Sequence, residues 1–229
     1  MSEAAGAILL AAGQGRRLGH DKSITAMAGQ PVLAHPLRSL LETPGIGRVV
    51  VTVRADVLAA AQQWLAGTPF PVDRVCFITG GKERQDSVGE GLEALGQAVE
   101  WVVVHDAARV LSTSRLMEKV MAAARATGAA AAAAKMADTV RATDPSGKIV
   151  RVVDREGLWR METPQVVRAE VLRKGLAIAR QRKVLVTDCL AAAELAGVPG
   201  VLVESGEPNL KITVPSDWAL SEAWLKQWR

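Results

Sequence analysis

The chain alternates short, wholly apolar runs with longer stretches in which apolar residues recur at helical spacing, and this alternation limits the folds open to it. The runs at 48–53 and 101–104 are rich in β-branched residues and are typical of strands buried on both faces. The stretches at 83–95 and 114–127 have the period of amphipathic helices. Strands buried on both faces need helices on both sides of their sheet, so the pattern predicts an α/β fold with a doubly wound, mostly parallel sheet.

The same criteria assign the other elements. Strands are expected at 7–11, 48–53, 74–79, 101–104, 184–186, 200–204 and 210–214. Helices are expected at 31–41, 56–65, 83–95, 114–127, 168–181, 188–195 and 216–228. The run Ala129–Ala134 is open to two interpretations, because alanine favours helices but Gly128 is a suitable C-cap and the topology requires a strand here. We predict a strand.

The segment from Met136 to Trp159 breaks the alternation. Two β-rich runs flank the turn sequence 144–147, which predicts a β-hairpin. A two-stranded hairpin is marginally stable by itself, so we expect this arm to pair with another copy of the chain in a homodimer. We expect residues 1–229 to form one domain that carries this arm.

Composition narrows the class of protein. Hydrophobic residues make up 49% of the 229 residues, yet no apolar run approaches the ~20 residues of a membrane span. The start of the chain lacks the pattern of a secretion signal and its two cysteines are far apart, which favours a cytoplasmic protein. Its net charge of +4 is spread along the chain and aromatics are 3%, which argues against nucleic acid and for small anionic substrates.

A glycine-rich turn with cations follows the first expected strand. It contains three glycines and three cations: Gly13, Gly15, Gly19, Arg16, Arg17 and Lys22. Glycines let backbone N–H groups approach phosphate oxygens, and the cations supply the opposite charge. The spacing matches neither the dinucleotide-binding turn nor the P-loop, and a basic surface loop is the alternative interpretation.

Two further loops directly follow strands. They are Gly80-Gly81 and the sequence His105-Asp106-Ala107-Ala108-Arg109. Ligands of open parallel sheets bind beyond the carboxyl ends of the strands, so these loops are expected to meet the first one. Asp106 is then a candidate ligand for Mg²⁺ on the substrate phosphates, with the N-cap of the next helix as the alternative.

Seven sequence blocks together resemble the 2-C-methyl-D-erythritol 4-phosphate cytidylyltransferase family. In chain order they are AAGQGRRLGHDK, GGKERQDSV, HDAAR, DTVR, VDREGLW, TPQ and NLKIT, and they span nearly the whole sequence. The resemblance implies a Rossmann-like core, CTP and a polyol phosphate as substrates, Mg²⁺ or another divalent cation as cofactor, and a homodimer with a swapped arm.

The resemblance also implies roles for individual residues. Arg17, Lys22, Arg155 and Lys211 would be the catalytic residues. The nucleotide would contact Ala11, Ala12, Gly13, Gly15, Gly81 and Ser87. The polyol phosphate would contact Asp106, Arg109, Thr139, Arg155 and Lys211, and Asp106 would also bind the metal. Thr139 and Arg155 lie on the arm, so they would serve the partner's site.

The sequence departs from the family pattern at a few positions. Val110 stands where HDAAR is usually followed by proline, Lys82 replaces a common acidic residue, and Cys189 stands where Glu often follows Thr-Asp. Alternatives are a ribitol 5-phosphate cytidylyltransferase, a molybdopterin-type or other sugar nucleotidyltransferase, and a catalytically silent nucleotide-binding subunit. The silent subunit is disfavoured because nucleotide binding alone does not require all four of the retained residues Arg17, Lys22, Asp106 and Lys211.

Overall fold

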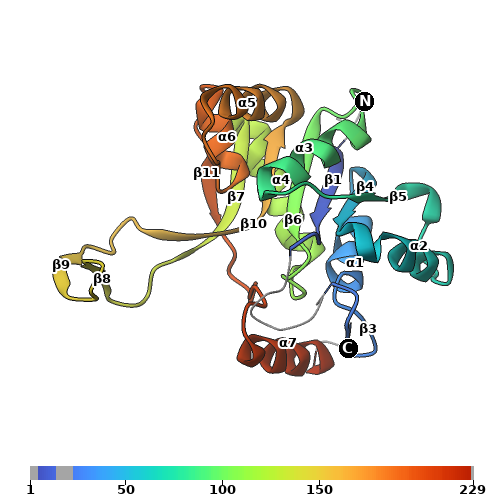
Figure 1. Ribbon diagram of the computed structural model, residues 1–229, viewed down its shortest axis with the longest axis horizontal. Coiled ribbons are helices and arrows are strands. Elements are labelled where there is room, and N and C mark those ends of the chain that lie inside the picture. Colours follow the sequence, from blue (N-terminus) through green and yellow to red (C-terminus); the bar gives the residue numbers. More distant parts are fainter. Residues whose placement is uncertain (1–4, 14–22, 228–229) are drawn as a thin grey trace.

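A seven-stranded sheet forms the centre of the computed structural model, which describes residues 5–13 and 23–227 (Figure 1). Its strand order is β11-β7-β10-β6-β1-β4-β5. All neighbours run parallel except β10, which is antiparallel to both β6 and β7. The predicted α/β class and the mostly parallel sheet are confirmed. The bounds are β1 Ala5–Leu10, β4 Ile46–Val53, β5 Val75–Thr79, β6 Trp101–Asp106, β7 Ala129–Lys135, β10 Trp159–Arg168 and β11 Val201–Glu204.

Helices cover both faces of the sheet, as the apolar strands require. One buried cluster contains residues of α1, α2 and α4, and a second, on the opposite face, contains residues of α3, α5 and α6. No helix in the described part of the chain is long and apolar enough to cross a membrane. The bounds are α1 Ala34–Glu42, α2 Leu58–Ala66, α3 Arg84–Leu95, α4 Ser114–Thr127, α5 Ala169–Arg182, α6 Cys189–Leu195 and α7 Pro215–Gln227, with short 3₁₀ turns at Ala55–Val57 and Val72–Arg74.

The alanine run is a strand, as predicted. It forms β7, and Ala129–Ala133 are fully buried between β10 and β11. Gly128 ends α4 in the left-handed conformation, with φ of 96°, and its N–H donates to the carbonyl of Ala124. The helix propensity of alanine is overridden here by pairing with two neighbouring strands.

Strand β10 is the element that the sequence does not predict. It contains Pro164. Proline has no N–H to donate to a neighbouring strand, and an interior strand has a neighbour on each side. The structure accommodates it with an irregularity in the pairing of β10 with β7 between Met161 and Gln165. The sheet therefore gains an interior antiparallel strand that leads directly from the arm into the core.

Three other expectations are wrong in detail. Helix α1 begins at Ala34 rather than at residue 31, because Gln30–Pro31 (β3) pair with Ala26–Met27 (β2) in a small hairpin. No strand forms at 184–186, where backbone N–H groups donate to the end of α5 and to a side chain of α3. None forms at 210–214 either, because Asp217 accepts hydrogen bonds from the N–H groups of the last two residues.

The predicted hairpin arm is present. Strands β8 (Val140–Thr143) and β9 (Ile149–Val153) pair antiparallel across the turn at 144–147. Figure 1 shows this hairpin projecting away from the sheet and helices. Among the described residues β8 and β9 pair only with each other, and Ile149, Val150 and Val152 are 57%, 64% and 57% exposed.

Helices α5 and α6 approach so closely that one position must be glycine. A Cβ atom on Gly175 would lie 1.9 Å from the carbonyl oxygen of Ala192 and 2.5 Å from its carbonyl carbon. These are backbone atoms, so a side chain at this position forces the two helices apart.

We expect Gly175→Ala to lower the free energy of unfolding by about 1–3 kcal/mol through overpacking, although Gly→Ala inside a helix normally adds up to about 1 kcal/mol. Urea unfolding of the purified variants measures the effect. Gly89→Ala in α3 is the matched control, since its Cβ would meet only the flexible end of Arg180. A Gly175→Ala midpoint at or above that of the wild type would contradict the packing argument.

Candidate active site

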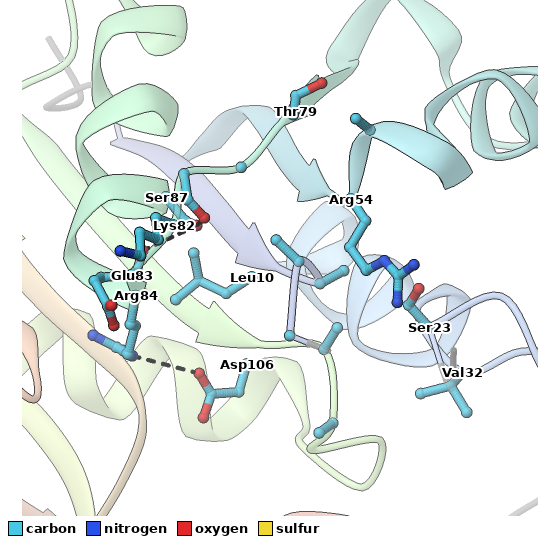
Figure 2. Close-up of a pocket in the computed structure, with 18 of the residues that line it drawn as sticks. Leu10, Ser23, Val32, Arg54, Thr79, Lys82, Glu83, Arg84, Ser87 and Asp106 are labelled. Carbon is cyan, nitrogen blue, oxygen red and sulfur yellow. Dashed lines mark hydrogen bonds and ion pairs between the residues drawn. The ribbon is translucent and has the colours of Figure 1, made fainter. Parts of the chain in front are cut away.

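A cavity of about 1050 Å³ lies beyond the carboxyl ends of β1, β5 and β6 (Figure 2). The predicted meeting of the three loops is therefore confirmed for their described residues. Of the residues predicted to contact substrates or metal, those lining the cavity are Ala11, Ala12, Gly13, Gly81, Ser87, Asp106 and Lys211.

The two glycines after β5 are required by close approach. A Cβ on Gly80 would lie 2.6 Å from the Cβ of Ala12, and one on Gly81 would lie 2.3 Å from the Cβ of Asp86. The N-terminus of α3 follows at once, closed by a capping box between Glu83 and Asp86. The turn after β5 is thereby held tightly against the segment that follows β1, and both line the same wall of the cavity.

Asp106 is the electrostatic centre of the site. It is the last residue of β6 and is 7% exposed. Lys211 Nζ lies 2.8 Å from its carboxylate, and the Nε atoms of Arg84 and Arg109 each lie 3.9 Å away. Burial by itself would raise the pKa of Asp106, but Lys211, Arg84 and Arg109 lower this pKa to about 2.

The alternative role of Asp106 as an N-cap is wrong. The next helix, α4, begins eight residues later, and its cap is Thr113, whose hydroxyl accepts from the N–H of Leu116 at 3.2 Å. The described residues contain no group of three His, Cys, Asp or Glu side chains that could hold a metal ion. A single carboxylate remains compatible with Mg²⁺ that is bound mainly through substrate phosphates.

The segment around Lys211 is fixed by hydrogen bonds to the turn that carries Asp106. Arg109 Nη1 donates to the carbonyl of Asn209 at 2.6 Å, and the N–H of Ile212 donates to the carbonyl of Ala108 at 2.9 Å. Lys211 lies between these two anchors. The structure thus brings together three of the predicted substrate-binding residues, Asp106, Arg109 and Lys211.

Glu162 is a buried carboxylate behind Arg109 that the sequence analysis missed. It is 2% exposed. Its oxygens accept from Arg160 Nη2 at 3.1 Å, Ser205 Oγ at 2.7 Å and Asn209 Nδ2 at 2.9 Å, and Arg109 Nη1 lies 3.9 Å away. The only sequence signal is its place before the TPQ block, in a strand that was not predicted.

A smaller cavity of about 270 Å³ adjoins these residues. Glu162, Thr163, Gln165 and Arg109 belong to its lining. Arg84, Asp106 and Lys211 line both cavities, so they mark the boundary between the two. Arg84 was not among the predicted site residues, although it belongs to the GGKERQDSV block.

Two of the other predicted site residues, both on the arm, lie away from this boundary. Thr139 and Arg155 are exposed on the arm and line neither cavity, and the guanidinium of Arg155 donates to the carbonyl of Ala137. Gly15, Arg17 and Lys22 lie outside the described residues.

His105 ties the turn of Asp106 and Arg109 to β10. Thr163 Oγ1 accepts from the N–H of Asp106 at 3.0 Å and lies 3.0 Å from His105 Nδ1, while His105 Nε2 lies 3.4 Å from the carbonyl of Arg109. Because the carbonyl of Arg109 can only accept, the proton of the neutral ring is assigned to Nε2, which leaves Nδ1 to accept from the hydroxyl of Thr163. Complete burial of the ring lowers the pKa of His105 to about 4.

Stability should fall in acid because His105 is held uncharged. Its folded pKa of about 4 lies below the ordinary 6.5, so between these values the unfolded chain binds a proton that the folded chain does not. The free energy of unfolding is therefore expected to drop by up to about 3 kcal/mol as the pH falls from 6.5 to 4. In His105→Gln, which keeps one acceptor and one donor, urea unfolding across this pH range should show a smaller loss. The same slope in both proteins would contradict the assignment.

A family model, a curated relative and a solved structure all match this chain over nearly its whole length. The family model described as "IspD: 2-C-methyl-D-erythritol 4-phosphate cytidylyltransferase" matches residues 5–227. A 2-C-methyl-D-erythritol 4-phosphate cytidylyltransferase from Vibrio cholerae is 41% identical over 226 residues, which cover 96% of each chain. The crystal structure of such an enzyme from Thermus thermophilus superposes with a TM-score of 0.78 at 29% identity, over 96% of this chain and 98% of that chain.

Some relatives are longer. A bifunctional enzyme IspD/IspF from Desulfotalea psychrophila is 35% identical over 97% of this chain, and the match spans 57% of that protein. The family match and the identities over nearly the whole length lead to one conclusion. This chain belongs to the 2-C-methyl-D-erythritol 4-phosphate cytidylyltransferase family.

Proposed function

We propose that this protein transfers a cytidylyl group from CTP to 2-C-methyl-D-erythritol 4-phosphate and releases pyrophosphate. The observation that carries the proposal is the boundary of the two cavities, where Asp106, Lys211 and Arg84 lie between a glycine-lined cavity and a smaller polar one. A donor nucleotide and an acceptor phosphate need adjoining sites with cations where they meet. Membership of the family supplies the identity of the two substrates.

The larger cavity suits the nucleotide. Ala12 and Gly13 line it from the segment after β1, and Gly81 and Ser87 line it from the turn and helix after β5. Because Gly80 allows the turn after β5 to pack against Ala12, the two segments form one wall of the cavity, and we propose that the cytosine ring lies against this wall and is recognised mainly by backbone groups. Larger purine rings would fit less well.

The reaction needs charge stabilisation more than proton transfer. An oxygen of the acceptor phosphate, already ionised at neutral pH, attacks the α-phosphorus of CTP, and the bond from this phosphorus to the bridging oxygen breaks. Pyrophosphate leaves with the bonding electrons, so no general base is required. Lys211 and Arg109 would hold the acceptor, while Arg17 and Lys22 would neutralise the α-phosphate.

A divalent cation would accompany the nucleotide. Asp106 is a carboxylate that lines both cavities, which is the donor expected for Mg²⁺ bound mainly by phosphates. Bound there, Mg²⁺ would withdraw charge from the triphosphate oxygens. Lys211 now pairs with Asp106 at 2.8 Å and would turn to the acceptor phosphate when the carboxylate takes the metal.

Pyrophosphate release tests the proposal directly. The purified protein with Mg²⁺ is assayed with each of the four nucleoside triphosphates against a panel of polyol phosphates. We expect turnover with CTP and 2-C-methyl-D-erythritol 4-phosphate at least about tenfold above that with ATP or GTP, because a pocket shaped for a pyrimidine excludes a purine. Preference for ribitol 5-phosphate or for a purine nucleotide would assign a different transferase, and no release with any pair would favour a nucleotide-binding subunit.

We also propose a homodimer in which each arm completes the partner's site. Ile149, Val150 and Val152 of β9 are more than half exposed, and β8 and β9 make no strand pairing with the body among the described residues. Thr139 and Arg155, which match substrate-binding positions of the family, lie on this arm and away from both cavities. A second copy would cover the apolar strand and receive the arm's cation.

Subunit mixing tests the shared site. Arg155→Ala and Lys211→Ala chains should each be nearly inactive, and mixing and refolding them should restore about a quarter of wild-type activity, since about half of the dimers then hold one intact site out of two. Arg151→Ala, which alters an exposed arginine of the same arm, is the matched control and should stay active. No recovery despite demonstrated subunit exchange would show that Arg155 acts within its own chain.

A further inference from the structure

Arg84 occupies an unusual place in the site. It is the first residue of α3, and its side chain is 27% exposed at the boundary of the two cavities. Figure 2 shows its guanidinium facing Asp106 across the end of the sheet. A group in this place can contact a ligand in either cavity.

Neutral acceptors hold the Arg84 side chain. Nη2 donates to Gln165 Oε1 at 3.3 Å and Nη1 to Cys189 Sγ at 3.8 Å. Burial raises the pKa of the Cys189 thiol, so this acceptor is uncharged at neutral pH. Gln165 is itself fixed, because its oxygen also accepts from the N–H of Cys189 at 2.9 Å and its Nε2 donates to the carbonyl of Glu162 at 3.1 Å.

The charge of Arg84 is not matched by a hydrogen-bonded carboxylate within the described ranges. Its Nε lies 3.9 Å from Asp106 Oδ1, and Asp106 is shared with Lys211, which is closer at 2.8 Å. The carboxylate of Asp188, which also lines the smaller cavity, accepts from the N–H of Ala191 as the cap of α6. Neutral groups thus orient the guanidinium through one N–H on each Nη atom, and its remaining N–H groups are available for an anion.

We propose that Arg84 binds the phosphate group of the acceptor and helps to set its angle of attack. This inference rests on the proposed function. The smaller cavity is lined by Arg84 together with Gln165, Arg109 and Lys211, so the guanidinium approaches an acceptor there from the side of α3. Lys82, two residues earlier, lines only the larger cavity and serves as the matched control.

Binding and turnover are measured separately. Calorimetry records the binding of 2-C-methyl-D-erythritol 4-phosphate to protein saturated with a CTP analogue whose α,β-methylene bridge prevents transfer. We expect Arg84→Gln to raise Kd for the acceptor by about tenfold to a hundredfold, since it removes charge-assisted hydrogen bonds. Lys82→Gln should change this Kd less than about twofold, because an exposed cation outside the smaller cavity adds little.

Steady-state kinetics add a second readout. In Arg84→Gln, KM for the acceptor should rise and kcat should fall, whereas KM for CTP should stay near that of the wild type. Arg84→Lys keeps the positive charge but loses the planar set of N–H donors, so its affinity for the acceptor should lie between those of the wild type and Arg84→Gln. If Arg84→Gln does not fold, Arg84→Lys provides the test. Thermal unfolding of each variant checks the fold.

The outcomes separate the two proposals. Wild-type affinity for the acceptor in folded Arg84→Gln or Arg84→Lys, or an equal loss in Lys82→Gln, would overturn the role of Arg84. Wild-type protein that binds the acceptor but releases no pyrophosphate would overturn the proposed function. The Kd of Arg84→Gln for the acceptor would then still decide whether Arg84 binds it. Wild-type protein that does not bind the acceptor at all would overturn both.

Discussion

One buried carboxylate organises the functional end of this molecule. Asp106 lies at the end of a central strand, where burial penalises its charge unless cations and hydrogen bonds compensate. The compensation comes from three elements: Arg84 begins α3, Arg109 follows in the same turn as Asp106, and Lys211 lies in the segment before α7. Pairing with one anion therefore gathers the cations that a phosphate-transferring site requires.

Strand β10 connects this cluster with the arm. It begins at Trp159 where the hairpin ends, and then presents Glu162, Thr163 and Gln165 toward the cluster. Each of these side chains fixes a different part of the site: the Asn209 segment, the Asp106 turn and the Arg84 guanidinium. One continuous strand thus runs from the base of the projecting arm to the residues that hold the charged cluster in place.

The sequence predicted most of the framework and part of the site. Apolar runs and helical periodicity located the strands of the core except β10, and the convergence of the turns after β1, β5 and β6 followed from the rule for open parallel sheets. It failed where a long-range contact overrode a local signal. Proline is disfavoured in interior strands, and the pairing irregularity that accommodates Pro164 depends on β7, a distant part of the chain.

The sequence by itself determined the α/β class, the glycine turns suited to phosphate, the hairpin and the family, because each of these depends on local periodicity or on short blocks of residues. What only the tertiary structure decided was the pairing of charges. Glu162 and Arg84 have no local pattern that distinguishes them from surface charges; their burial and partners arise when β10, α3 and the segment before α7 pack together. Electrostatic interactions depend on distance in space and on the surrounding dielectric, and neither quantity is a property of neighbouring residues in the chain.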